Sequence, residues 1–272
     1  MRARWPYFAP GMDERNLREA IVEIGRRLYE RGYIVASDGN ISVRLPEGRI
    51  LTTPTGVCKG FLTPQMLVVV DSEGRKLEGT LPPSSELAMH LEIYRKRPDV
   101  HAVVHAHPPC GTGFAAAGMS LDKPLVSEIV LTLGCIPLAG YGTPSTQELV
   151  AAIAPYVPHY NALLLANHGA VTYGPDLETA YFRMETLEHF ARITLVAKLL
   201  GSEQPLSAEA VQKLLQIRER AGTTFPDPTS CSPPNQAFPT SSDEIITLTR
   251  QELVELVVEV VRGVLRHLKP VR

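Results

Sequence analysis

The 272-residue sequence lacks several features that would assign it to a specialised class. No apolar run approaches the roughly 18 residues that a membrane-spanning helix requires. The N-terminal stretch is basic, but no apolar segment follows it, so no secretory signal is predicted. An excess of positive charge is also missing, since 27 Lys and Arg oppose 29 Asp and Glu for a net charge of -2. Proteins that coat nucleic acid carry a basic excess, and this balance argues against that role.

Cysteine is scarce, with four residues in the chain: Cys58, Cys110, Cys135 and Cys231. None of them forms a CxxC pair, which is more typical of a reducing cytosol than of a disulfide scaffold. The hydrophobic fraction of 44% is ample for a sizeable core. At this length we expect one domain with an appendage. The composition therefore predicts a cytoplasmic globular protein with neither a nucleic acid nor a membrane as its partner.

Helix and strand signals alternate over residues 1–222 and predict a single α/β domain. Asp13 precedes apolar residues at helical spacing, and Gly32 marks the end of that helix. Strands are expected at 41–43, 49–52, 67–70, 100–107 and 162–166, and further helices at 84–95, 177–200 and 207–220. Hairpin turns outnumber crossovers in this order, so the pattern favours a central, mostly antiparallel sheet flanked by helices.

The character of the chain changes after residue 222. Residues 223–243 are rich in Pro and Ser and almost free of aliphatic side chains, which is typical of a linker. Residues 244–272 then predict an amphipathic helix, with a capping box from Thr249 to Glu252 and apolar residues at three- and four-residue spacing. Such a helix requires a groove or another helix to cover its apolar face. It either docks on a partner, folds back on its own subunit or joins subunits of an oligomer.

Three histidines form a candidate metal site. His105 and His107 end a predicted strand, where side chains two residues apart share a face. His168 follows another strand end and can turn toward the same place. Three histidines with an open fourth position are typical of a catalytic zinc site. The alternative is three solvated loop histidines, and His101 on the same strand is interpreted as a buried, hydrogen-bonded residue.

Three short segments suit an anion such as phosphate. Residues 37–40 supply an amide side chain after a glycine, and residues 53–56 supply a hydroxyl and backbone N–H groups. Residues 83–86 open a predicted helix, whose N-terminus favours negative charge. Ordinary turn and capping chemistry explains any one of these segments alone. Glu86, expected in the first turn of the helix, becomes a candidate general base if a cation and a phosphate ester lie nearby.

Together the segments SDGNISVR, LTTPTGV, PPSSELAMH, HAVVHAHP, PLAGYGTPSTQEL and LLLANHGAV closely resemble the class II aldolase/adducin family, in particular its aldolases for L-fuculose 1-phosphate. The resemblance covers residues 14–220 and implies a three-layer sandwich and a C4 homotetramer with active sites between subunits. It implies one Zn²⁺ per subunit on His105, His107 and His168, with Glu86 as acid/base residue and resting-state fourth ligand. The phosphate would be held by a further set of residues: Asn40, Thr55, Gly56, Ser84 and Ser85.

The resemblance implies cleavage of a phosphorylated sugar, a ketose 1-phosphate, to dihydroxyacetone phosphate and a small aldehyde such as lactaldehyde. A dehydratase of the methylthioribulose-phosphate type, a 4-epimerase and a non-catalytic adducin-like protein remain alternatives. The related epimerases carry Asp at the position of Glu86, which favours an aldolase. The family tyrosine that protonates the aldehyde oxygen is missing from residues 125–128, as is a second one near the C-terminus. Glu128 either replaces the first as the acid or is an ordinary surface residue.

The C-terminal extension resembles the encapsulation peptides that carry enzymes into bacterial microcompartments. This implies a shell or co-cargo protein as the partner of residues 249–268. The enzyme would then lie in the cytoplasm or in the lumen of such a compartment.

Overall fold

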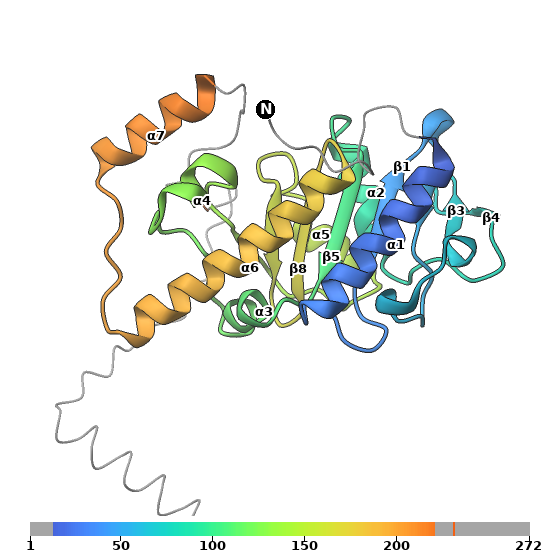
Figure 1. Ribbon diagram of the computed structural model, residues 1–272, viewed down its shortest axis with the longest axis horizontal. Coiled ribbons are helices and arrows are strands. Elements are labelled where there is room, and N and C mark those ends of the chain that lie inside the picture. Colours follow the sequence, from blue (N-terminus) through green and yellow to red (C-terminus); the bar gives the residue numbers. More distant parts are fainter. Residues whose placement is uncertain (1–12, 221–230, 232–272) are drawn as a thin grey trace, which may run out of the picture. The chain divides into compact units, whose positions relative to one another are not determined.

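The computed structural model of the chain describes residues 13–220 and residue 231 (Figure 1). The predicted linker at 223–243, apart from Cys231, and the predicted helix at 244–272 lie outside the described residues, as does the expected domain boundary at 222. Within the described part of the chain, no helix combines the length and the apolar character needed to cross a membrane.

An eight-stranded sheet forms the centre of the domain. Its strands in spatial order are β4 (Lys76–Glu78), β3 (Val68–Val70), β2 (Ile50–Thr52), β1 (Asn40–Arg44), β5 (Ala102–Ala106), β8 (Gly169–Gly174), β7 (Ala162–Leu165) and β6 (Leu138–Ala139). All neighbouring pairs are antiparallel except β6 and β7, which are parallel. The prediction of a mostly antiparallel sheet is therefore confirmed.

Helices cover both faces of the sheet and complete three layers (Figure 1). The first face packs against α1 (Glu14–Glu30), α3 (Pro109–Ala116), α4 (Ser127–Thr132), α6 (Leu177–Leu199) and α7 (Ala208–Arg220). The second face packs against α2 (Leu87–Lys96) and α5 (Gln147–Ile153). Alternate residues of the central strands belong to opposite core clusters, as the two-residue period of a strand requires. Short 3-10 turns η1 (Pro46–Gly48), η2 (Lys59–Phe61) and η3 (Pro64–Met66) connect the early strands.

The helix ends follow the local sequence signals with one informative exception. The Asp13 side chain accepts a hydrogen bond from the Asn16 N–H at 2.8 Å and caps α1 as predicted. Helix α2, by contrast, begins at Leu87, three residues after its predicted start. Pro83 instead forms an antiparallel bridge with Pro54, which ties the residues before α2 to another loop. Glu86 is therefore the N-cap residue of α2 and does not lie in its first turn.

The cysteines depart from the expectation of a chain without disulfides. Cys135 and Cys231 form a disulfide across a sequence separation of 96 residues, and Cys231 packs on the core cluster beneath α2 and α5. Cys58 and Cys110 are free. A pair so far apart in sequence has no characteristic spacing, so the sequence pattern could not reveal it.

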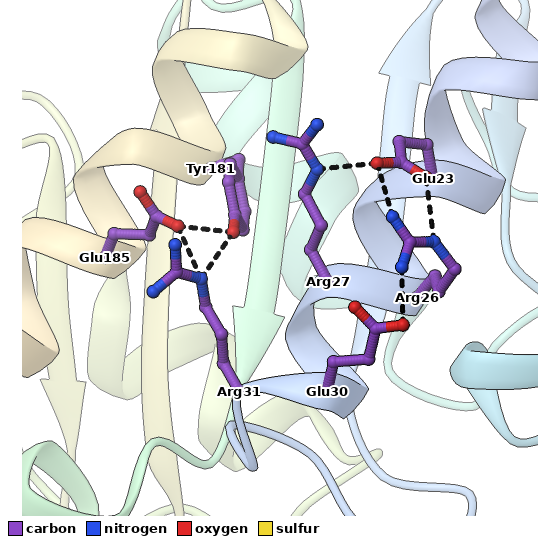
Figure 2. A network of polar contacts seen from close by, with 7 residues as sticks. All are labelled: Glu23, Arg26, Arg27, Glu30, Arg31, Tyr181 and Glu185. Atoms are coloured by element: carbon purple, nitrogen blue, oxygen red, sulfur yellow. Dashed lines mark hydrogen bonds and ion pairs between the residues drawn. The ribbon is translucent and has the colours of Figure 1, made fainter.

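A polar network joins the end of α1 to α6 (Figure 2). Arg31, the C-cap residue of α1, donates from Nε to the Tyr181 hydroxyl at 3.0 Å and lies 2.7 Å from Glu185 Oε1. The Tyr181 hydroxyl in turn donates to Glu185. The Arg27 guanidinium lies 5.9 Å from the centre of the Tyr181 ring. Because Tyr181 is only 1% exposed, its hydroxyl depends on these partners for hydrogen bonding.

We expect Tyr181→Phe to lower the free energy of unfolding by about 1–1.5 kcal/mol, because it deletes a hydroxyl that is both donor and acceptor in a buried position. Urea denaturation measures the change. Tyr29→Phe is the matched control, since Tyr29 lies on α1 and is 39% exposed. It should change stability by less than about 0.5 kcal/mol. Equal effects of the two substitutions would contradict a stabilising role for the Tyr181 hydroxyl.

Candidate active site

The candidate site lies where β1, β5 and β8 meet at one end of the sheet. Asn40, the first residue of β1, is opposite His105 on β5, and His105 is opposite Val171 on β8. The turn from β7 to β8 contains Asn167 in the left-handed region at φ 54°, a conformation that asparagine tolerates. His168 follows it directly. Strand register and this turn thus bring together residues that are more than 120 positions apart in sequence.

Gly39 lies where the chain entering β1 approaches the backbone of β5 closely. Its φ of +68° favours glycine, and a Cβ there would lie 2.8 Å from the His105 carbonyl oxygen and 2.7 Å from Ile34 Cγ2. A side chain at this position would therefore separate Asn40 from His105. The glycine of the SDGN segment is explained by packing within the site.

His105, His107 and His168 converge, with one ligand nitrogen from each lying within 4.8 Å of the others. The His105 ring is fully buried, and its Nδ1 donates to the Ala170 carbonyl at 2.9 Å, which leaves the Nε2 lone pair facing the cluster. His107 Nδ1 lies 3.4 Å from Asp38 Oδ2. A carboxylate at this nitrogen favours the tautomer that leaves the His107 Nε2 lone pair free.

The arrangement fits a metal ion. His105 Nε2 and His107 Nε2 are 3.2 Å apart, and two lone pairs at that distance repel unless a cation or proton lies between them. His168 Nδ1 and Glu86 Oε1 are buried and have no hydrogen-bond partner among residues 13–220 and 231. A buried polar set with unmatched acceptors is the expected appearance of a metal-binding site. Imidazole ligands accept several divalent metals, so the donor set does not by itself select zinc.

Glu86 spans the histidine cluster. Its Oε2 lies 3.2 Å from His105 Nε2, and its Oε1 lies 3.1 Å from His168 Nε2. As an N-cap residue it would usually bond to its own helix, yet its side chain makes no capping bond and turns to the histidines instead. Burial raises the pKa of the Glu86 carboxyl, but the imidazoles of His105 and His168 outweigh burial and hold that pKa well below its ordinary value. The carboxylate is thus kept ionised within a largely enclosed site.

A cavity of about 400 Å³ adjoins this cluster and collects the three predicted anion-binding segments. Its walls include all five predicted phosphate residues together with Glu86, His107 and His168: Asn40, Thr55, Gly56, Ser84 and Ser85. The Thr55 N–H donates to the Pro82 carbonyl, which holds the segment at 53–56 against the segment before α2. Residues from three separate loops therefore line one cavity beside the candidate metal site.

Comparison with known families decides the relationship. Residues 19–195 match the Class II Aldolase and Adducin N-terminal domain, well over half of the chain. The chain belongs to this family. The resemblance of the sequence segments and the three-layer fold that it implied are thereby confirmed.

Members of the family with different named activities have similar sequence identity to this chain. The 3-oxo-tetronate 4-phosphate decarboxylase of Escherichia coli is 36% identical over 209 residues, covering 75% of this chain and 96% of that protein. The L-fuculose phosphate aldolase of Methanococcus maripaludis is 36% identical over 180 residues, covering 66% and 96%. The crystal structure of YgbL from Klebsiella pneumoniae superposes with a TM-score of 0.70 at 37% identity, covering 75% of this chain and all of that one.

One sequence-based interpretation requires correction. His101 is exposed, because β5 begins only at Ala102 and leaves His101 outside the sheet interior. Glu128 is exposed on the first turn of α4 and is not among the residues that line the cavity. Within one described chain Glu128 therefore does not reach Glu86 or the histidines.

The sequence analysis overlooked His90, a fully buried histidine of α2 that connects to the site. His90 Nε2 donates to the Asn40 side-chain oxygen at 2.5 Å, and its Nδ1 accepts from the Ser42 hydroxyl at 2.7 Å. Asn40 Nδ2 then donates to Glu86 Oε2 at 2.9 Å. Since His90 fixes which end of the Asn40 amide faces Glu86, it orients both side chains. Its i+4 position after Glu86 on the same helix was the available signal.

Burial, assisted by the charge of His105, lowers the pKa of His90 from 6.5 to about 3. The unfolded chain therefore binds a proton that the folded chain does not between these pH values, and stability falls as the pH decreases through them. We expect His90 to contribute up to about 1.4 kcal/mol per pH unit to this slope. Urea denaturation of metal-free protein between pH 7 and 4.5 gives the free energy of unfolding at each pH. Its dependence on pH should be shallower by that amount in His90→Gln than in wild type. Parallel pH profiles would contradict the neutral, buried state of His90.

Proposed function

We propose that this class II aldolase is a metal-dependent lyase that reversibly cleaves a ketose 1-phosphate, with L-fuculose 1-phosphate the leading substrate. The products are dihydroxyacetone phosphate and a small aldehyde such as L-lactaldehyde. The observation that carries the proposal is the position of Glu86, whose carboxylate accepts a hydrogen bond from Asn40 and lies within 3.2 Å of His105 and His168, beside a cavity lined by phosphate-binding types of residue.

In this proposal His105, His107 and His168 hold one Zn²⁺, with Glu86 as fourth ligand at rest. The ion would supply Lewis acidity toward adjacent carbonyl and hydroxyl oxygens of the sugar. The phosphate would be held by the residues around the cavity: Asn40, Thr55, Gly56, Ser84 and Ser85. Binding the phosphate end fixes the sugar, so that Glu86 meets one carbon only.

Cleavage breaks the bond between the α- and β-carbons of the ketone, as the hydroxyl on the β-carbon loses its proton and becomes the aldehyde oxygen. The bonding electron pair stays on the dihydroxyacetone phosphate fragment as an enediolate. In the synthetic direction the ionised Glu86 removes a proton from that carbon, and in cleavage it returns that proton to the enediolate. Glu128, contributed by a neighbouring subunit of a C4 homotetramer, is the proposed group that exchanges the hydroxyl proton.

A second candidate is decarboxylation of a 3-oxo acid phosphate, favoured by the relative of that activity from Escherichia coli. Loss of carbon dioxide from such an acid leaves the same enediolate for Glu86 to protonate. Carbon dioxide leaves without a proton, so this reaction does not require the missing tyrosine. A dehydratase with Glu128 as its acid and a 4-epimerase use the same cavity. A non-catalytic, adducin-like role has no need for Glu86 among three histidines.

The deciding experiment measures dihydroxyacetone phosphate release from a panel of ketose 1-phosphates and from 3-oxo-tetronate 4-phosphate, with carbon dioxide measured in parallel. Release with an aldehyde and without carbon dioxide supports the aldolase, and the preferred sugar gives the substrate. Release with equimolar carbon dioxide supports the decarboxylase. Metal-loaded protein that releases dihydroxyacetone phosphate from neither class would overturn both and favour the dehydratase.

We further propose that the C-terminal extension acts separately from catalysis, with residues 249–268 binding a microcompartment shell or co-cargo protein. Deletion of residues 244–272, which retains Cys231 and its disulfide with Cys135, should then leave kcat, KM and the oligomeric state unchanged and abolish co-sedimentation with assembled shells. Loss of activity or of the oligomer on deletion would instead show that the extension joins subunits.

A further inference from the structure

Lys59 is a buried cation at the candidate active site that the proposed chemistry has not yet used. It is only 2% exposed and lines the same cavity as Asn40, Thr55 and Gly56. Among the described residues around that cavity it is the only Lys or Arg. Burying an ammonium group is costly unless it is matched by acceptors or by an anion, so its position calls for an explanation.

The Lys59 ammonium joins two of the three anion-binding loops. Its Nζ donates to the Ser37 carbonyl at 2.5 Å and to the Val57 carbonyl at 2.9 Å. Ser37 begins the segment that ends in Asn40, and Val57 directly follows Gly56. An ammonium group has three donors, and these two bonds leave one for another acceptor.

The first of these loops is conformationally strained and benefits from such a bond. Ala36 has a φ of 47°, in the left-handed region that residues with a Cβ rarely occupy. The carbonyl that Lys59 binds belongs to the very next residue, Ser37. The ammonium group thus holds the strained turn in the conformation that presents Gly39 and Asn40.

The approach of α1 explains how Lys59 becomes buried. Turn η2, which begins at Lys59, packs against α1 at Gly25, where a Cβ would lie 2.5 Å from the Lys59 carbonyl oxygen. The glycine therefore allows the turn to sit against the helix and directs the chain inward. Burial lowers the pKa of Lys59 below its ordinary value, and the carboxylates of Asp38 and Glu86 offset this lowering only in part.

We propose that Lys59 is the positioning cation of the phosphate site, which rests on the proposed function of a phosphorylated substrate. Its ammonium fixes the loops at 37–40 and 55–57 at their proper separation and supplies the positive charge that a phosphate dianion needs. Two carboxylates, Asp38 and Glu86, also border the cavity. Without Lys59 their charge would oppose phosphate binding.

The test compares Lys59→Met with Lys213→Met, which removes the same charge from an exposed position on α7. Inorganic phosphate and dihydroxyacetone phosphate are titrated into each metal-loaded protein by calorimetry. Dihydroxyacetone, which lacks the phosphate, is titrated as the control ligand. We expect Lys59→Met to lower the affinity for both phosphate-containing ligands by about 10- to 100-fold, as for the loss of a charged hydrogen bond. Binding of dihydroxyacetone should change less than about threefold, and Lys213→Met should resemble wild type.

Kinetics on the preferred substrate provide a second readout, where the expected change lies mainly in KM. Melting temperatures identify a variant that is merely misfolded, and Lys59→Arg then takes its place, since it retains the charge and should retain most phosphate affinity. Equal losses for phosphorylated and unphosphorylated ligands would overturn the proposal in favour of a purely structural lysine. Wild-type protein that binds no phosphate would instead refute the proposed function itself.

Discussion

The Glu86→Gln variant should release dihydroxyacetone phosphate at least about 10³-fold more slowly than wild type. This is the largest loss of turnover that we expect from a single substitution. The amide is nearly the same size as the carboxylate and can still accept from Asn40, so the cavity keeps its shape. It cannot exchange a proton with carbon. The loss should appear in kcat, while KM changes little because the phosphate contacts are intact.

The measurement is a coupled assay of dihydroxyacetone phosphate at saturating substrate, with metal content determined on the same samples. Glu92→Gln serves as the control, because Glu92 lies on the same helix and pairs with Arg95 on the side away from the cavity. It should retain wild-type turnover. A Glu86→Gln enzyme with more than about a tenth of wild-type turnover would assign the proton transfer to another group.

Removal of the metal is the second large effect. Dialysis against a chelator should lower turnover by at least about 10²-fold, and one equivalent of Zn²⁺ per chain should restore it. His105→Gln should lose the same activity irreversibly, because its Nε2 is central to the cluster and its Nδ1 bond to Ala170 fixes the ring. Elemental analysis provides a readout independent of activity, with about one metal per chain expected in wild type and far less in the variant.

His101→Gln is the appropriate comparison, since His101 precedes the same strand but is exposed. It should bind metal and turn over as wild type does. Full activity in chelator-treated protein with no residual metal would refute the metal-dependent mechanism. If Mn²⁺ or Co²⁺ but not Zn²⁺ restored turnover, the three-histidine site would stand and its metal would be reassigned.

The fold and most of the candidate site are readable from the sequence, because the relevant signals are local. Strand ends place His105 and His107 on one face, and the turn after β7 places His168, so register alone brings them together. The helix start at Leu87 was missed because the deciding interaction, the bridge between Pro54 and Pro83, is not local. The same applies to the disulfide of Cys135 and Cys231.

Lys59 and His90 were missed for a different reason. A lysine three residues after Gly56 and a histidine inside an amphipathic helix are ordinary residues in sequence. Their importance depends on burial, which arises from the packing of η2 on α1 for Lys59 and from the position of α2 against the sheet for His90. Glu128 is the opposite case, because a carboxylate suited to acid chemistry lies on an exposed turn of α4.

The hydrogen bond between Asn40 and Glu86 has a consequence for altering what this enzyme accepts. Asn40, which is proposed to bind the phosphate, also donates a hydrogen bond that orients the Glu86 carboxylate. Substrate binding and proton transfer therefore depend on the same amide. Broadening the enzyme toward unphosphorylated sugars by changing Asn40 would therefore slow turnover on every substrate. Redesign of substrate scope would have to begin at other residues that line the cavity, such as Pro144 and Ser145, which take no part in that bond.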